Sequence, residues 1–358
     1  MRASFWACAI VAATAACQAG SPAVVVEDAS VDDVLEPVDR LIIVVDAPPT
    51  DTPVTPDTPI STDTPAVADG PTPDVISGDA PAVDTVAYTG SFGASSGAYT
   101  LTVGGRARSV RIHVPPGVSA SAPLVIAYHG TNGAAADFEA ETRIDAASDA
   151  LGFIAAIPQA EDRQGSPADA DHQSRDLYAA MWDITDRNPA TNRDLLLTRA
   201  IILEGRRALR VDDRRVYLMG HSNGGFFAYH AAATISSRVA GFATSCAGVI
   251  RCGYRVDCTF SAGVGTTCAA LSTERGFCPQ VCAASMSYMA PIAAPRMPRA
   301  YLAHGNRDDL VSVSFSCALA REMGSRAEVQ IVDGLTHSLA PDFVRSAWSR
   351  LSRYTVND

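Results

Sequence analysis

The sequence predicts an α/β fold with a mostly parallel sheet and helices on both of its faces. Short, continuously apolar runs are typical of parallel strands that are buried on both sides, and segments with helical spacing lie between several of them. The expected strands are 123–128, 153–157, 216–219, 299–303 and 329–332, after a hairpin of 99–103 and 107–114 around Gly104-Gly105. The expected helices are 194–209, a stretch after Gly225, 314–323 and 341–351.

The N-terminal residues match the pattern of an export signal. Arg2 is followed by an apolar run of about ten residues and then by small residues directly before Cys17. The run is too short to cross a membrane, which takes about 20 apolar residues. We therefore expect residues 1–16 to be a signal peptide. Small residues before Cys17 favour a bacterial lipoprotein of the cell surface or outer membrane. Thr14, where that pattern usually has Leu, keeps ordinary secretion as the alternative.

Residues 17–87 have the composition of a disordered tether. The stretch 22–86 holds 14 of the 39 acidic residues, one of the 28 basic residues and 11 of the 22 prolines. Such a segment buries too little apolar surface to fold, and its prolines favour extended chain. We expect the folded domain to be 88–358. Because the net charge of −11 belongs mainly to the tether, the domain gives no electrostatic reason to expect nucleic acid as a partner.

The run 220–224, Gly-His-Ser-Asn-Gly, predicts a nucleophile at Ser222. It follows an expected strand and precedes an expected helix, which is the context that a G-x-S-x-G motif requires. Small flanking residues permit the sharp turn, and the helix N-terminus favours developing negative charge. A second match at 93–97, centred on Ser95, has no strand before it and no helix after it, so we reject it.

The base and the acid should follow Ser222 in the order acid, then histidine. Of the seven histidines, His304 and His337 lie at a useful distance. His337 falls in a polar loop after the last expected strand, where the base belongs, whereas His304 ends a strand. The acid should follow the preceding strand. We favour Asp308, which would orient His337, with Asp309 as the alternative and Asp333 as a weaker candidate.

An oxyanion hole needs two main-chain N–H donors near the serine. One is expected from Asn223, the residue after the nucleophile. The other is expected from the loop after His129-Gly130, with Thr131 as the favoured donor and Asn132 as the alternative.

These residues form an ordered set with several other short motifs. The additional motifs are His129-Gly130, 158–160, Trp182, 192–194, 211–217 and His304-Gly305. Over residues 98–350 the set resembles the polyhydroxybutyrate depolymerase and feruloyl esterase group of secreted α/β-hydrolases. The resemblance implies an α/β-hydrolase fold and a carboxylic-ester hydrolase without metal or cofactor, with Ser222, Asp308 and His337 at the triad positions. The chain departs from the group at Ser338–Pro341, where Trp-Pro-Gly often follows the histidine.

A cluster of cysteines lies between the predicted nucleophile and acid. Apart from Cys8 and Cys17, the cysteines are Cys246, Cys252, Cys258, Cys268, Cys278, Cys282 and Cys317. In an exported protein such a cluster usually forms disulfides, and the paired C-x2-C units of a zinc site are lacking. We expect a disulfide-stapled cap insert at about 246–298. One cysteine is left over, either Cys317 or Cys246.

Three functions follow from these patterns. The leading one is hydrolysis of an ester through an acyl-Ser222 intermediate. The resemblance implies polymeric polyesters (polyhydroxybutyrate-like) and plant-wall esters (feruloyl or acetyl) as candidate substrates. The same triad also serves peptidases and acyltransferases. The third is a catalytically inactive, tethered binding protein, against which the complete Ser, His and Asp set argues. We expect an ester as the partner and membrane contact only through a lipid on Cys17.

Overall fold

The computed structural model describes residues 86–162, 180–184, 186–249, 267–269, 297–356 and 358. The predicted signal peptide 1–16, Cys17 and nearly all of the predicted tether 17–87 lie outside these residues, as does most of the predicted insert 246–298. In the part of the chain that is described, no helix has the length and apolar character needed to cross a bilayer.

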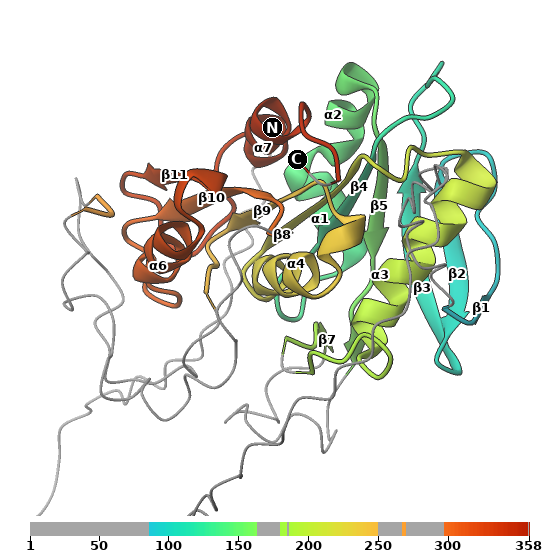
Figure 1. The fold of residues 1–358 in the computed structure, drawn as a ribbon, viewed down its shortest axis with the longest axis horizontal. Coiled ribbons are helices and arrows are strands. Elements are labelled where there is room, and N and C mark those ends of the chain that lie inside the picture. The colour runs from blue at the N-terminus through green and yellow to red at the C-terminus, as the bar shows by residue number, and fades with distance from the viewer. Residues whose placement is uncertain (1–85, 163–179, 185, 250–266, 270–296, 357) are drawn as a thin grey trace, which may run out of the picture. The chain divides into compact units, whose positions relative to one another are not determined.

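Nine strands of the described residues form one sheet (Figure 1). They are β1 (Tyr88–Thr89), β2 (Gly97–Val103), β3 (Arg106–His113), β4 (Leu124–Tyr128), β5 (Ile154–Pro158), β8 (Val216–His221), β9 (Gly241–Ser245), β10 (Arg299–Gly305) and β11 (Ala327–Val332). Their order is β1-β2-β3-β5-β4-β8-β9-β10-β11. All neighbours from β5 to β11 pair in parallel, and the first three strands pair antiparallel. The predicted mostly parallel sheet is confirmed.

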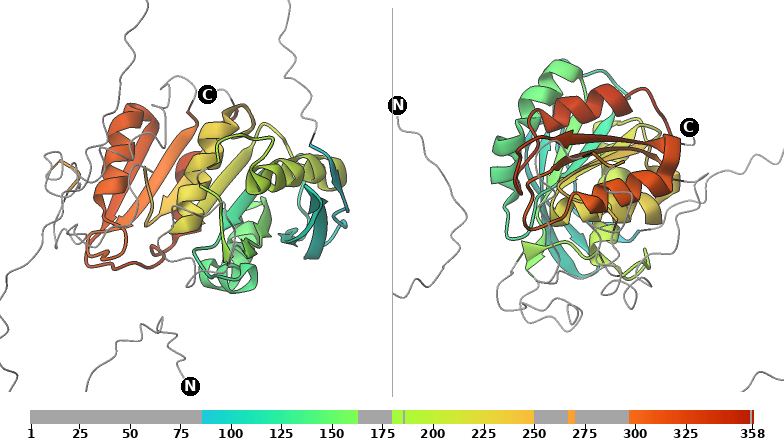
Figure 2. Two further views of the ribbon diagram at one scale, coloured as in Figure 1. Left: turned by 90° about the horizontal axis from the view of Figure 1, so that it is seen from below. Right: turned by 90° about the vertical axis from the view of Figure 1, so that its left-hand side faces the viewer.

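Helices pack on both faces of this sheet, as Figures 1 and 2 show. One face carries α1 (Ala135–Thr142), α2 (Ile144–Leu151) and α7 (Phe343–Leu351), and the other carries α3 (Arg193–Glu204), α4 (Asn223–Thr234) and α6 (Ser314–Met323). In β4, Leu124 and Ile126 pack under α3 and α4, while Val125 and Ala127 pack under the opposite helices. Because both faces are covered, every residue of β4 is buried, which explains its continuous apolar run.

The chain reverses its direction across the sheet beside β4. It runs outward from β4 to β5 and then returns to the other side of β4, where β8 pairs with it. In open α/β sheets, ligands bind at the carboxyl ends of the strands where such a reversal occurs. The loop after β4 and the turn after β8 therefore meet where a substrate is expected.

Some elements are not predicted by the sequence. Strand β9 reads Gly-Phe-Ala-Thr-Ser, so it lacks the run of large apolar residues that marks the other strands, although all five residues are buried. Helix α1 buries only Ala135 and Phe138 and shows little apolar periodicity. The last helix begins at Phe343 rather than at 341, because Asp342 has a left-handed backbone with φ 49°.

The described cysteines settle which of the two candidates is unpaired. Cys317 forms a disulfide with Cys268, so the expectation that Cys317 could be the leftover cysteine is wrong. Cys246 is free and buried. The remaining cysteines of the cluster lie outside the described residues, so the rest of the pairing stays a prediction. The disulfide links residues of the predicted insert to α6.

Candidate active site

Ser222 lies in a sharp turn between β8 and α4. Its backbone has φ 52° and ψ −125°, a conformation that costs a non-glycine residue about 1–3 kcal/mol. A Cβ on Gly220 would lie 2.1 Å from Gly224 O, and one on Gly224 would lie 2.3 Å from His129 O, so both flanking positions require glycine. By contrast, Ser95 of the second motif match is exposed in a bend just before β2.

His337 and Asp308 reach Ser222 from two loops at the carboxyl end of the sheet. Asp308 follows β10, and His337 follows β11. His337 Nδ1 lies 2.8 Å from Asp308 Oδ2, and His337 Nε2 lies 2.9 Å from Ser222 Oγ. Because an ionised carboxylate can only accept, Nδ1–H donates to Asp308 and leaves Nε2 to accept the hydroxyl proton of Ser222. The structure thus joins the predicted nucleophile, base and acid in one hydrogen-bonded chain.

Asp308 is held as a buried carboxylate. Its Oδ1 accepts hydrogen bonds from the main-chain N–H groups of Leu310 at 3.0 Å and Val311 at 2.8 Å. Burial by itself raises the pKa of Asp308, but the hydrogen bonds from His304 and His337 outweigh burial and hold this pKa well below its usual range. Asp308 therefore carries a negative charge beside His337 at neutral pH.

The other candidates for the acid and the base take different positions. Asp309 is exposed, and Asp333 accepts a hydrogen bond from Asn306 Nδ2 at 2.5 Å. His304 is fully buried behind the acid, where its Nε2 lies 3.2 Å from Asp308 Oδ2. His304 and His337 thus approach the same oxygen of Asp308.

His221 packs directly against His337, a contact that the sequence does not predict. The ring centroids of His221 and His337 lie 5.2 Å apart. Burial, followed by the nearby His337, lowers the pKa of His221 to about 3. The ring of His221 is therefore neutral near pH 7 and adds no charge beside His337.

The residues expected to form the oxyanion hole lie on either side of Ser222. Asn223 is the first residue of α4, so its N–H has no acceptor within the helix. Thr131 follows Gly130, and a Cβ on Gly130 would lie 3.4 Å from Ser222 Cβ. The loop after β4 and the first turn of α4 are thus both adjacent to Ser222.

Buried polar side chains shape the loop after β4. His129 Nε2 accepts from the N–H of Ala160 at 3.1 Å, so Nδ1 carries the proton and donates to Gly130 O at 2.7 Å. Burial lowers the pKa of His129 and so favours this neutral form. Gln159 Nε2 donates to Gly133 O at 3.1 Å. The short motifs at 129–130 and 158–160 therefore act together on the same loop.

Cys246 lies beside the Asp308–His337 pair, which the sequence does not predict. It follows β9, and its thiol donates to Ser338 O at 3.2 Å. Burial, followed by the charge of Asp308, raises the pKa of the thiol to about 12, so Cys246 stays protonated. The sulfur and one ligand atom each of Asp308 and His337 lie within 4.8 Å of one another. These atoms are already used in hydrogen bonds, so we assign no metal to them.

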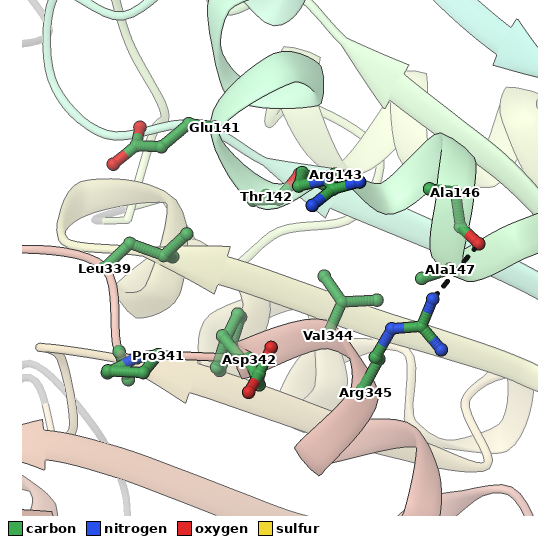
Figure 3. Close-up of a pocket in the computed structure, with 12 residues that line it drawn as sticks. Glu141, Thr142, Arg143, Ala146, Ala147, Leu339, Pro341, Asp342, Val344 and Arg345 are labelled. Carbon is green, nitrogen blue, oxygen red and sulfur yellow. Dashed lines mark hydrogen bonds between the residues drawn. The ribbon is translucent and has the colours of Figure 1, made fainter. Parts of the chain in front are cut away.

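A cavity of about 320 Å³ lies between α1 and α2 on one side and the start of α7 on the other (Figure 3). Charged side chains among its lining residues are Glu141, Arg143, Asp342 and Arg345. The triad residues are not part of this lining, but Leu339, two residues after His337, is. The cavity therefore adjoins the loop that carries the base.

No known family model matches the chain. "Putative esterase NocK" of Nocardia uniformis subsp. tsuyamanensis is 33% identical over 156 residues, which cover 42% of this chain and 41% of NocK. The bifunctional acetylxylan esterase/xylanase XynS20E of Neocallimastix patriciarum is 27% identical over 139 residues, which cover 39% of this chain and 18% of XynS20E. The matched region thus spans less than half the length of these curated relatives.

Solved structures with a similar arrangement include acetyl xylan esterase 1 from Thermoanaerobacterium sp., with a TM-score of 0.49, 16% identity and coverage of 75% of this chain and 88% of that enzyme. An S-formylglutathione hydrolase from Agrobacterium tumefaciens has a TM-score of 0.47, 17% identity and coverage of 70% and 91%.

The fold is that of the α/β-hydrolases. The sheet order, the turn around Ser222 after β8, and the chain order of Ser222, Asp308 and His337 all agree with it. The fold expected from the sequence is therefore confirmed, whereas the chemistry is argued from the site itself.

Replacing Asp308 by Asn is expected to destabilise the fold in a pH-dependent way. Because the folded-state pKa of Asp308 is depressed, its contribution to the free energy of unfolding is present above the unfolded-state pKa of about 3.9 and is lost as pH falls through the folded-state pKa. Urea titrations should show the largest difference between the wild type and Asp308→Asn above about pH 5, and a shrinking difference below it. A difference that grows on acidification would contradict the assignment of a charged Asp308.

Proposed function

We propose that the chain is a serine carboxylic-ester hydrolase. The observation that carries this proposal is the unbroken series of hydrogen bonds from Ser222 through His337 to Asp308, at 2.9 and 2.8 Å. A serine hydroxyl with an imidazole as base and a buried carboxylate behind it is the arrangement of an activated nucleophile. The names of the two curated relatives, both of which include esterase, support the same reaction.

In the proposed reaction, Ser222 Oγ attacks the ester carbonyl carbon while its proton passes to His337 Nε2. The main-chain N–H groups of Thr131 and Asn223 stabilise the negative charge that develops on the carbonyl oxygen. The bond to the alcohol oxygen then breaks, and that oxygen takes the proton from His337 and leaves acyl-Ser222. A water molecule attacks the acyl group and gives a proton to His337; the bond between the acyl carbon and Ser222 Oγ then breaks, Oγ takes that proton from His337, and the carboxylic acid leaves. Asp308 stabilises the imidazolium in both steps.

We propose that the substrate is an ester of a polymer. Among polymeric esters, we favour an acetyl ester of a plant-wall polysaccharide. The resemblance of the motifs also keeps feruloyl esters and polyhydroxybutyrate-like polyesters as candidates. The name of XynS20E, an acetylxylan esterase/xylanase, favours the acetyl ester.

The proposed ester hydrolysis is tested by measuring kcat for p-nitrophenyl acetate with the wild type and with Ser222→Ala. Removal of the nucleophile should lower kcat about 10⁴-fold or more. The matched control is Ser95→Ala, which alters the exposed serine of the second G-x-S-x-G match and should keep the wild-type kcat. Equal, low rates for the wild type and Ser222→Ala would contradict the proposal. Release of acetate from acetylated xylan, of ferulate from feruloyl esters or of hydroxybutyrate from polyester then identifies the substrate class.

We also propose that the protein is exported, with a lipid on Cys17 as its anchor. The basic start, the short apolar run and the small residues before Cys17 support this location. Mass spectrometry of the mature N-terminal peptide from a bacterial host should find Cys17 first and lipid-modified, and Cys17→Ser should release the protein from the membrane fraction. A mature N-terminus elsewhere, without lipid, would instead indicate ordinary secretion.

A further inference from the structure

A short segment, Ala180 to Trp182, bridges the two halves of the proposed oxyanion hole. Trp182 Nε1–H donates to His129 O at 2.8 Å, which ties the segment to the end of the loop after β4. The main-chain N–H of Trp182 donates to Asn223 Oδ1 at 2.7 Å, and Asn223 Nδ2 donates back to Trp182 O at 3.3 Å. Trp182 therefore contacts both the element that carries Thr131 and the residue that offers the other N–H.

A second pair of hydrogen bonds holds the same loop next to Thr131. The N–H of Asn132 donates to Ala180 O at 2.8 Å, and the N–H of Ala180 donates to Asn132 Oδ1 at 3.3 Å. Asn132 has a left-handed backbone with φ 58°, a conformation that asparagine tolerates better than most residues. The N–H of Asn132, the alternative second donor, is thus bonded to Ala180 O, and the loop directly after Thr131 is tied to the segment.

The segment is itself anchored in the core. Trp182 is 1% exposed, and its ring packs on Tyr128 and Phe227 with centroid separations of 5.1 and 5.4 Å. Directly after it, the N–H of Asp183 donates to Asp194 Oδ2 at 2.7 Å. Asp194 Oδ1 in turn accepts from Arg108 at 2.7 Å. A side chain held this firmly can fix the spacing of the two elements that it joins.

We propose that Trp182 is a positioning residue that sets the spacing between the main-chain N–H groups of Thr131 and Asn223. The inference rests on the proposed ester hydrolysis. The two donors stand on different elements, the loop after β4 and the start of α4, and both must lie about 2.7–3.1 Å from the oxyanion. A misplacement of about 1 Å at such a site can cost about 100-fold in rate. Trp182 acts through these elements and does not itself contact the reacting atoms.

Two variants separate this role from a merely structural one. Trp182→Phe keeps an aromatic ring in the cluster but removes the Nε1–H that holds His129 O. Asn223→Ala removes the side-chain pair with Trp182 but keeps the main-chain N–H that is the proposed donor. With p-nitrophenyl acetate, each is expected to lower kcat about 10- to 100-fold with little change in KM. The double variant should lose less than the product of the two single losses, because both disturb the same bridge.

Binding of an aryl boronic acid provides a second readout, because it forms a tetrahedral anion on a nucleophilic serine. Its Ki should weaken in each variant by the same factor as kcat/KM. The matched control is Trp348→Phe, at a buried tryptophan on the opposite face of the sheet that packs on Phe153 and Tyr217; it should keep the wild-type kcat and Ki.

The outcomes that overturn the inference are distinct from those that overturn the proposed function. If the wild type is as inactive toward the ester as Ser222→Ala, the proposed function is wrong. If the wild type is active and folded Trp182→Phe keeps its kcat and Ki, or only raises KM, the positioning role is wrong. Should Trp182→Phe not fold, unchanged values for Asn223→Ala overturn the inference equally.

Discussion

The close packing of the first turn of α4 against the ends of β4 and β8 is the constraint on which the site depends. Gly224 lies so near the main chain of β4 that a Cβ there would be 2.3 Å from both Tyr128 O and His129 O. In the same turn Ser222 has a strained backbone with φ 52°, and the loop after β4 lies against Ser222. The start of α4 and the glycine-containing loop after β4 both offer main-chain N–H groups next to Ser222. In acyl transfer, negative charge develops on the carbonyl oxygen at such a position.

The electrostatics of the site follow from burial. Three hydrogen bonds, from two main-chain N–H groups and His337, surround the carboxylate of Asp308 together with His304 Nε2 at 3.2 Å from Oδ2, and these contacts offset the cost of burying its charge. His221 and Cys246, which both lie beside His337, are uncharged at neutral pH, because burial lowers the pKa of His221 and raises that of Cys246. Asp308 is therefore the charge that orients His337.

The sequence predicts the parts of the structure that leave a local pattern. Ser222 is found from its motif between strand and helix, and Asp308 and His337 from their order after it, because adjacent parallel strands end at the same edge of a sheet. Strand β9 is missed because it has only one large apolar side chain. The positions of Cys246, His221 and Trp182 arise from contacts between segments far apart in the chain, for which no local pattern exists.

Covalent labelling of the full chain with a fluorophosphonate, followed by peptide mapping, tests the central claim most directly. The reagent reacts with a serine only when a base activates it, so it reports the nucleophile independently of any substrate. A single adduct on Ser222 that His337→Ala strongly slows is the predicted result. An intact, folded protein that takes no label, or takes it on another serine such as Ser95, would contradict the assignment of Ser222 as the nucleophile.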